Sequence, residues 1–268
     1  MIGDFLSRCS VVDVESTSPD ANTCDIIELA CSVYAPDTQE WVVFDDWFKP
    51  TIPIPALSAE KHFIRDMDVQ DKPQFSSFMS TPLATIAKGV DYFVAHNAKY
   101  DRTAIVNNMA RFGLSDTETN IGEEERWFCT YRLSQKIFNN DPNIESHRLT
   151  YLWFQLGLCN STNKMLVPHK ADSDIFMAGK LFELLVLILI DRGIVDPSKD
   201  IGSQVWEYQN SPIEITHFPF GKHKGVPMDE VPTSYLEWCV ANMDTLNEES
   251  DSFDPDFTAA VVKQFERR

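Results

Sequence analysis

Four segments carry the alternation of apolar and polar residues, or the short apolar runs, that are typical of β-strands. They are Ser10–Glu15, Ile26–Tyr34, Glu40–Phe48 and Asp91–His96. The first three follow one another closely, and the turn-like stretch Ala35–Thr38 separates the second from the third. We therefore expect a meander of three strands to open the domain.

Helical periodicity follows in three segments, from Asp101 to about Phe112, from Arg148 to Leu158 and from Asp172 to Arg192. Gly113 is a typical residue to end the first helix. The third helix is apolar nearly all round, which predicts that it is buried. Strands first, and then strand and helices in alternation, predict an α/β fold: a mixed sheet flanked by helices.

The pattern weakens between residues 194 and 212. We therefore expect a main domain over residues 1–195, a linker over residues 196–212 and a small α+β module over residues 213–268. The module combines basic residues with aromatic ones, a combination that suggests contact with nucleic acid. They are Lys222, His223, Lys224, Phe218, Phe220, Tyr235 and Trp238. Alternatively, the aromatics form a miniature core while Gly221 and Gly225 frame a hairpin turn. Both hold if the lysines face outward.

The chain of 268 residues has a net charge of −18, which argues against the broad electropositive face that dominates non-specific duplex binding. It fits a site of clustered carboxylates that binds divalent cations.

The six cysteines include no C-x-x-C pair and indicate a reducing compartment rather than disulfides or a zinc site. No secretory signal is visible at the N-terminus, and the apolar stretch Leu181–Ile190 is too short to span a bilayer. We expect a cytoplasmic protein with no membrane partner.

Asp13 and Glu15 lie two residues apart on a predicted strand, so both side chains leave the same face. Two such carboxylates raise each other's pKa unless a cation lies between them. An exposed strand with incidental acidic residues gives the same short pattern. Asp101 comes where a strand ends and a helix begins, a place that suits a ligand site in an α/β sheet and equally a helix cap.

His169 and Asp174 are five residues apart, which on one continuous helix places them on different faces. Pro168 and the cap-like Asp172 instead predict that the helix starts after His169. The histidine then lies on a loop, where it can act as a mobile base or be an ordinary surface residue, while Asp174 is fixed in the first helical turn.

In this order, the three segments resemble the exonuclease motifs of the DEDDh (DnaQ-like) 3′→5′ exonucleases. The matching positions are Asp13-Val14-Glu15, the stretch from His96 to Asp101, and His169 with Asp174. The resemblance runs from about residue 10 to residue 250. Five further segments are similar to the exodeoxyribonuclease X branch of the family: Ala59–Ile64, Asp71–Pro73, Trp127–Thr130, Phe220–Gly225 and Tyr235–Trp238.

The resemblance implies an RNase H-like fold and a site for two Mg²⁺ or Mn²⁺ ions. By the family pattern, Asp13, Glu15 and Asp174 ligate one ion, Asp13 bridges to the second, and Asp101 supports the cluster through water. His169 acts as the general base that takes a proton from the attacking water.

Contacts with the substrate are expected from Ser16, Thr17, His62, Asn97 and Tyr100. Ser16 and Thr17 follow the first motif, and His62 matches a family position near the 3′ end. Tyr100 can stack on a base or belong to the core, and Asn97 can pin the end of the strand or touch DNA. The chain departs from the family's usual Gly-Leu-type turn, because Ser16-Thr17-Ser18-Pro19 stands there.

These features predict a 3′→5′ exodeoxyribonuclease that releases mononucleotides from single-stranded DNA or from the 3′ ends of duplex DNA, and DNA repair is one pathway for such an enzyme. Two alternatives stay open. One is an exoribonuclease of the same chemistry, because sugar preference depends on a few contacts to the 2′ position. The other is a catalytically silent, nuclease-like module that binds a partner.

Overall fold

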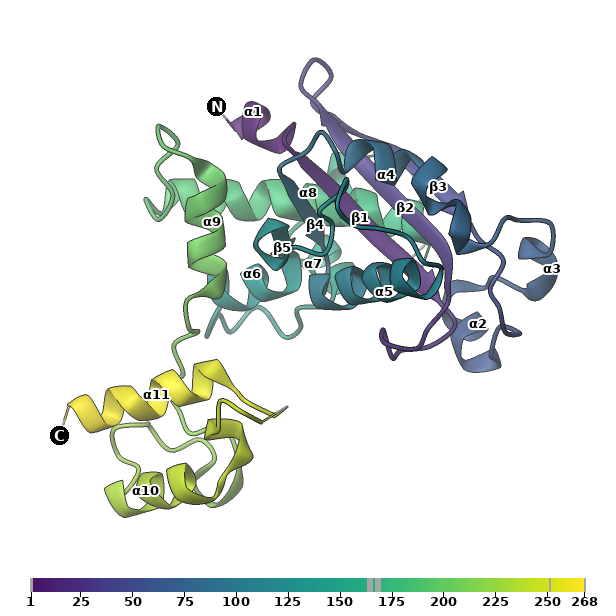
Figure 1. The fold of residues 1–268 in the computed structure, drawn as a ribbon. Coiled ribbons are helices and arrows are strands. Elements are labelled where there is room, and N and C mark those ends of the chain that lie inside the picture. The colour runs from purple at the N-terminus through teal and green to yellow at the C-terminus, as the bar shows by residue number, and fades with distance from the viewer. Residues whose placement is uncertain (1, 163–165, 167–169, 251, 268) are drawn as a thin grey trace. The chain divides into compact units, whose positions relative to one another are not determined.

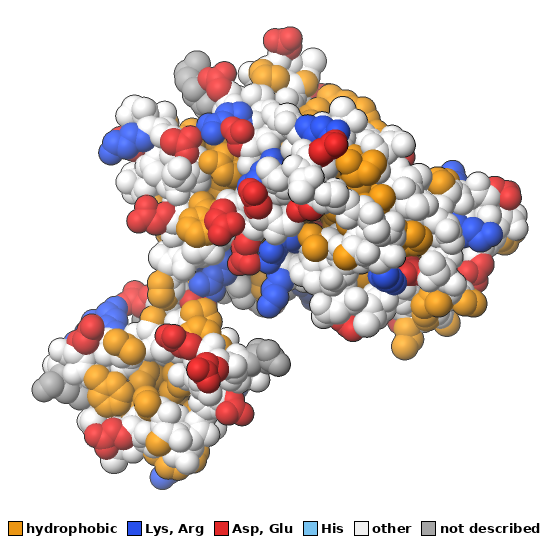
Figure 2. Space-filling model, viewed as in Figure 1, with side chains coloured by type: hydrophobic (Ala, Val, Ile, Leu, Met, Phe, Trp, Pro, Cys, Tyr) orange, Lys and Arg blue, Asp and Glu red, His pale blue; other side chains and the backbone are white. Residues whose placement is uncertain are grey.

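The computed structural model describes residues 2–162, 166, 170–250 and 252–267. The chain forms two compact units, Met1–Gln209 and Asn210–Arg268. Acidic side chains are spread over both units on the face shown in Figure 2, in keeping with the net charge of −18.

The first unit is built on a five-stranded sheet with the order β3-β2-β1-β4-β5 (Figure 1). The strands are β1 Cys9–Ser16, β2 Ile26–Ala35, β3 Glu40–Trp47, β4 Tyr92–Ala95 and β5 Trp127–Cys129. β1 pairs antiparallel with β2, and β2 with β3, which confirms the predicted meander. β4 joins β1 in parallel, and β5 joins β4 in parallel. The predicted mixed sheet is therefore present, with the short β5 as an added strand at its edge.

Helices cover both faces of the sheet, and in Figure 1 α4 and α5 lie in front of it and α8 behind. The α-helices of this unit are α1 Ile2–Leu6, α2 Ala56–His62, α3 Asp66–Val69, α4 Pro82–Ile86, α5 Ala98–Arg111, α6 Thr130–Ile137, α7 Leu149–Gln155, α8 Ala171–Asp191 and α9 Ile201–Asn210. Short 3-10 helices are η1 Phe75–Ser80, η2 Glu124–Arg126 and η3 Leu158–Ser161. The two faces carry separate apolar cores because neighbouring strand residues point to opposite sides: Val11 belongs to the core under α8, and Val12 to the core under α5.

Helix α8 is buried along most of its length, as its apolar sequence predicts. Gly179 allows it to approach the sheet closely, since a β-carbon at this position would lie 2.8 Å from the Trp41 ring. Within the described residues, no helix combines the length and the apolar character that crossing a bilayer requires.

The linker expected over residues 196–212 is wrong, because α9 fills most of it and packs into the first unit. Ile201 and Val205 of α9 are buried in the core under α8. Gln209 accepts a hydrogen bond from the Cys129 N–H (2.6 Å) and donates one to the Trp127 carbonyl (3.2 Å). α9 therefore supplies side-chain partners to the backbone of edge strand β5.

The second unit contains α10 Thr233–Asn242 and α11 Pro255–Glu266, with the 3-10 helices η4 Gly221–His223 and η5 Asp244–Leu246. Its described residues pair as β-structure only in the isolated bridge between His217 and Pro227, so it contains less β-structure than the predicted α+β module. Phe218, Leu236 and Phe257 lie at the centre of its own small core.

Candidate functional site

Strand β1 presents Asp13 and Glu15 on one face of the sheet, as their spacing predicts. Val12 and Val14, which alternate with them, are buried in the core on the opposite face. The two acidic residues lie on the face that α8 covers, where carboxylate oxygens of Asp13, Glu15 and Asp174 lie within 4.8 Å of one another. Segments far apart in the sequence thus bring three oxygen ligands to one point.

Asp174 comes from the first turn of α8, which begins at Ala171. The prediction that this helix starts after His169 is confirmed. The N-cap is Lys170, however, and Asp172 lies inside the first turn without a capping hydrogen bond, so the predicted cap is wrong. His169 itself lies outside the described residues.

Asp101 lies behind this cluster and is 3% exposed. β4 pairs with β1 only as far as Val11, so the β1 edge beyond it is open to other partners. There the Asp101 carboxylate accepts a hydrogen bond from the Val14 N–H at 3.2 Å. Because α5 begins at Ala98, three residues before the predicted start, Asp101 lies inside the first turn and is not the helix cap.

The pKa values of these carboxyl groups are raised. Burial, followed by the charges of Asp101 and Asp174, raises the pKa of Asp13 well above its usual range. Burial, and then Asp174, raises the pKa of Glu15 to about 8. The pKa of Asp101 is raised to about 8 by burial, against the opposing effect of its backbone hydrogen bonds. Carboxylates that are costly to ionise together are suited to hard divalent cations, which prefer oxygen ligands and offset the repulsion.

Glu28 is a buried carboxyl group beside the cluster that the sequence analysis did not select. It lies on β2 directly opposite Glu15 and is 4% exposed. Burial and Asp45 raise its pKa to about 8, while a hydrogen bond from the Ala171 N–H at the start of α8 acts in the opposite direction. Glu28 thus connects the sheet to the helix that carries Asp174. The available sequence signal was an acidic residue inside the apolar run Ile26–Leu29.

A cleft of about 840 Å³ opens in front of Asp13 and Asp174. Its other lining residues are His96, Asn97, Tyr131, Arg148, Leu149, Thr150, Tyr151 and Phe154. Phe154 is 64% exposed, although it is a large apolar side chain. Arg148 belongs to no ion pair among the described residues. The cleft therefore offers a positive charge and an accessible aromatic ring beside the carboxylates.

Sequence reasoning missed most of this wall, although a signal was present. Leu152, Trp153 and Phe154 are consecutive in the short helix α7, and one helix face cannot bury all three. Leu152 and Trp153 are buried, so Phe154 points outward. His96 has its pKa lowered to about 4 by burial, and its Nδ1 lies 2.9 Å from the Thr130 hydroxyl.

Of the predicted substrate residues, Asn97 lines the cleft. It is the N-cap of α5 with φ of 76°, a left-handed conformation that asparagine tolerates at the turn from strand to helix. Ser16 and Tyr100 contact each other through their hydroxyl groups at 2.5 Å, and the Tyr100 hydroxyl donates to the Ser18 carbonyl. Tyr100 therefore ties down the turn that departs from the family pattern.

Thr17 and His62 are buried, at 2% and 3% exposure. The Thr17 carbonyl accepts a hydrogen bond from the Ser58 hydroxyl at 2.8 Å. His62 Nδ1 accepts the Ile64 N–H at 3.0 Å, and its ring also contacts the backbone of Ser16, while burial lowers its pKa. Both residues brace the same turn from within, and direct contact of their side chains with substrate stays a prediction.

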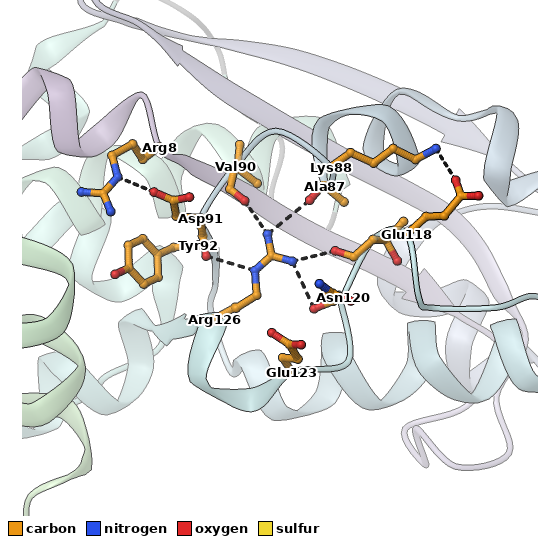
Figure 3. A pocket seen from close by; sticks show the side chains of 11 residues that line it. Arg8, Ala87, Lys88, Val90, Asp91, Tyr92, Glu118, Asn120, Glu123 and Arg126 are labelled. Atoms are coloured by element: carbon orange, nitrogen blue, oxygen red, sulfur yellow. Dashed lines mark hydrogen bonds and ion pairs between the residues drawn. The ribbon is translucent and has the colours of Figure 1, made fainter.

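A second pocket, of about 440 Å³, lies where β1 and β4 begin, at the opposite end of these strands from the carboxylates (Figure 3). Arg126 stands at its centre with its guanidinium 4.7 Å from the centre of the Phe93 ring. All five of its N–H donors are engaged by backbone carbonyls, those of Ala87, Val90, Asp91, Thr119 and Asn120. No donor of Arg126 is left to bind a ligand, so its role here is structural.

Comparisons with known proteins show what this chain is similar to. The family model RNase_T, described as exonuclease, matches residues 10–182. A search of curated proteins finds no match. Among solved structures, exonuclease X in complex with 5′-overhanging duplex DNA is 21% identical with a TM-score of 0.51, over 75% of this chain and 99% of that chain.

E. coli exonuclease I in complex with an oligonucleotide is 10% identical with a TM-score of 0.51, over 75% of this chain and 42% of that one. Exonuclease I from Methylocaldum szegediense is 13% identical with a TM-score of 0.52, over 69% and 40%. This chain thus spans less than half of each exonuclease I. At such low sequence identity, the structural likeness supports the RNase H-like fold alone. The family model covers more than half of the chain and shows that this protein belongs to the DEDDh (DnaQ-like) exonuclease family.

Proposed function

We propose that the protein is a 3′→5′ exodeoxyribonuclease that releases mononucleotides from DNA ends. The observation that carries the proposal is the carboxylate cluster: Asp13, Glu15 and Asp174 have oxygens within 4.8 Å of one another at a cleft, and Asp101 lies behind them. A role in DNA repair and a cytoplasmic location stay predictions from the sequence.

Two Mg²⁺ or Mn²⁺ ions fit this donor set, because oxygen ligands suit hard cations and two dications balance four carboxylates. When bound, such ions supply positive charge that stabilises the attacking and leaving oxygens of an in-line displacement at phosphorus. Asp13, Glu15 and Asp174 would hold them, while Asp101 fixes the β1 backbone through Val14. His169, two residues before α8, would accept the proton of the attacking water.

The wall of the cleft supports a nucleic-acid strand as substrate. Arg148 can pair with a phosphate, and the exposed Phe154 ring can stack on a base, as aromatic residues do with single strands. Two similar structures, those of exonuclease X and E. coli exonuclease I, are complexes with duplex DNA and with an oligonucleotide. We infer that a single-stranded 3′ end enters the cleft alongside α7.

The test is direct cleavage of labelled substrates with Mg²⁺. A 5′-labelled DNA strand should shorten progressively from its far end, and a 3′-labelled strand should release its label as a mononucleotide at once. Progressive shortening of the 3′-labelled strand instead would overturn the polarity. A matched RNA strand tests the sugar preference, and faster cleavage of RNA than of DNA would contradict the deoxyribonuclease assignment.

The variant His169→Ala tests the base. Its turnover should fall by about 10²- to 10⁴-fold, the contribution typical of general base catalysis. The variant should still gain thermal stability on addition of Mg²⁺, because the carboxylates that would bind the metal remain. Turnover at the wild-type rate would remove His169 from the mechanism while leaving the metal site untouched.

A further inference from the structure

The C-terminal unit, Asn210–Arg268, closes a core of its own before any partner is considered. Phe218 and Phe257 are buried against each other with ring centres 5.4 Å apart. The loop from Phe218 to Val226 folds back on itself, since the Phe218 N–H donates to the Val226 carbonyl and the Gly225 N–H to the Phe218 carbonyl, each at 2.8 Å. The aromatic residues therefore do form a miniature core, and what lies outside that core needs a separate explanation.

Rings are also stacked outward from this core to the surface. The centre of the Tyr235 ring lies 5.6 Å from that of the buried Phe218 and 5.7 Å from that of Trp238. The Tyr235 and Trp238 rings are 23° from parallel. His223 packs edge-on against Tyr235 at 4.4 Å. Trp238 ends the stack and is 53% exposed. Its indole is thus held in place by the tyrosine while a large part of it faces solvent, an unusual position for so large a ring.

Two lysines flank the histidine of this stack. Lys222 and Lys224 are both exposed, and within the described residues neither takes part in an ion pair. By contrast, Lys263 of the same unit pairs with Glu214 at 2.7 Å. Acidic residues outnumber basic ones in this unit, so two unpaired lysines beside an exposed ring stack are a local exception.

We propose that Lys222, Lys224, Tyr235 and Trp238, here called the Trp238 face, form a second, non-catalytic binding site for single-stranded nucleic acid. Flat base faces suit the indole, and backbone phosphates suit the lysines. Duplex DNA fits less well, because duplex binding depends on a wide basic surface, and the net charge of −18 argues against such a surface. The proposal rests on the proposed function in one respect: the ligand is taken to be of the same class as the substrate of the nuclease. A second site on the same chain keeps the strand near the cleft by raising its effective concentration.

The variants are Trp238→Ala, Trp238→Phe, which retains a ring, and Lys222→Gln with Lys224→Gln. A matched control is Phe265→Ala with Lys263→Gln, which removes another exposed ring and a paired lysine from α11 of the same unit. Each is made in the protein with both units and with Asp174→Asn, and it is assayed without metal so that the strand is not degraded. Anisotropy of a labelled oligodeoxythymidylate then measures affinity for a long strand and for one of only a few nucleotides.

Trp238→Ala should weaken binding of the long strand about five- to a hundredfold, the range typical of losing a stacked base. Trp238→Phe should restore part of that loss, and the lysine variant should weaken binding and flatten its salt dependence. The proposal is overturned if Trp238→Ala binds the long strand as tightly as the Phe265→Ala control, or if an acidic peptide competes for the face while the long strand does not. In either case cleavage by the unmodified protein, measured separately, still decides the proposed function.

Discussion

Charged side chains lie at both ends of the central sheet, but they are paired with partners at one end and clustered with like charges at the other. Where β1 and β4 begin, Arg8 pairs with Asp91 at 2.5 Å and with Asp200 at 3.1 Å. Lys88 pairs with Glu118 at 2.6 Å nearby, and the donors of Arg126 are all engaged (Figure 3). Cations and acceptors are matched there, and the contacts join separate chain segments.

At the other end, carboxyl groups collect against one another. Burial and the neighbouring carboxylates raise the pKa values of Asp13 and Glu15, and burial raises that of Asp101. Such an arrangement lowers the stability of the metal-free protein, which is typical of sites kept for function rather than for folding. A pocket rich in charged side chains therefore indicates chemistry only where those side chains are not paired with opposite charges or hydrogen-bond partners of the same chain.

The largest expected effect comes from removing one carboxylate at the functional end. Asp174→Asn should lower turnover by at least about a hundredfold, because even outer-shell changes at metal sites cost about 10- to 100-fold. Release of mononucleotides from labelled DNA is the measurement. Asp172→Asn, an exposed residue in the same helical turn, is the matched control and should cleave nearly as fast as the unmodified protein. Equal rates for the two variants would contradict the assignment.

A substitution at the opposite end of the sheet should lower the stability of the protein but leave its cleavage activity unchanged. Arg126→Leu leaves five carbonyls without their donor, and we expect the free energy of unfolding to fall by about 2–4 kcal/mol. Urea denaturation measures this loss. Arg65→Leu, at an exposed ion pair with Asp68, is the control and should hardly move the midpoint. A folded Arg126→Leu protein that has lost cleavage would show that the two ends are not separate.

Local rules explain which parts of the fold and the site were predictable from sequence. The period-two pattern placed Asp13 and Glu15 on one face, and the start of the apolar helix α8 placed Asp174 in its first turn. Both statements depend only on neighbouring residues. β5 contains three residues, too few to show a period, and its place in the sheet depends on pairing with β4.

Tertiary contacts account for what was missed. α9 looked like a linker because polar residues interrupt its apolar pattern, and one of them, Gln209, gains its role from hydrogen bonds to the backbone of β5. Glu28 became part of the site through the register that sets it opposite Glu15 and through the start of α8. Nothing in the spacing of these residues along the chain indicates such partners.

The pH dependence of metal binding sharpens the contrast between the two ends. Glu15 and Asp101 have pKa values of about 8 in the folded protein, well above the value of about 4 expected in the unfolded chain. Between these values the folded state binds more protons than the unfolded state, so the stability of the metal-free protein falls as the pH rises from about 4 to 8. Mg²⁺ then takes the place of the protons. The rise in Tm on adding Mg²⁺ should therefore be larger near pH 8 than near pH 5.

Differential scanning fluorimetry at the two pH values measures this effect. Asp174→Asn has one carboxylate fewer and should show a smaller difference between them, whereas Arg126→Leu, at the other end, should lower Tm but keep the difference. An Mg²⁺ effect of the same size at both pH values would contradict the coupling between protons and metal at this cluster.

The smallest expected effect is on substrate affinity at the wall of the functional cleft. Phe154→Ala should raise KM for single-stranded DNA several-fold, since stacking of one base contributes about 1–3 kcal/mol, and should change kcat much less because the carboxylates are untouched. Stability should stay nearly constant, as Phe154 is 64% exposed. Leu187→Ala, an apolar residue of α8 that is 44% exposed and does not line the cleft, is the matched control. If both variants keep the KM of the unmodified protein, the strand does not pass along α7, and the charge of Arg148 is then the remaining element of that wall to test.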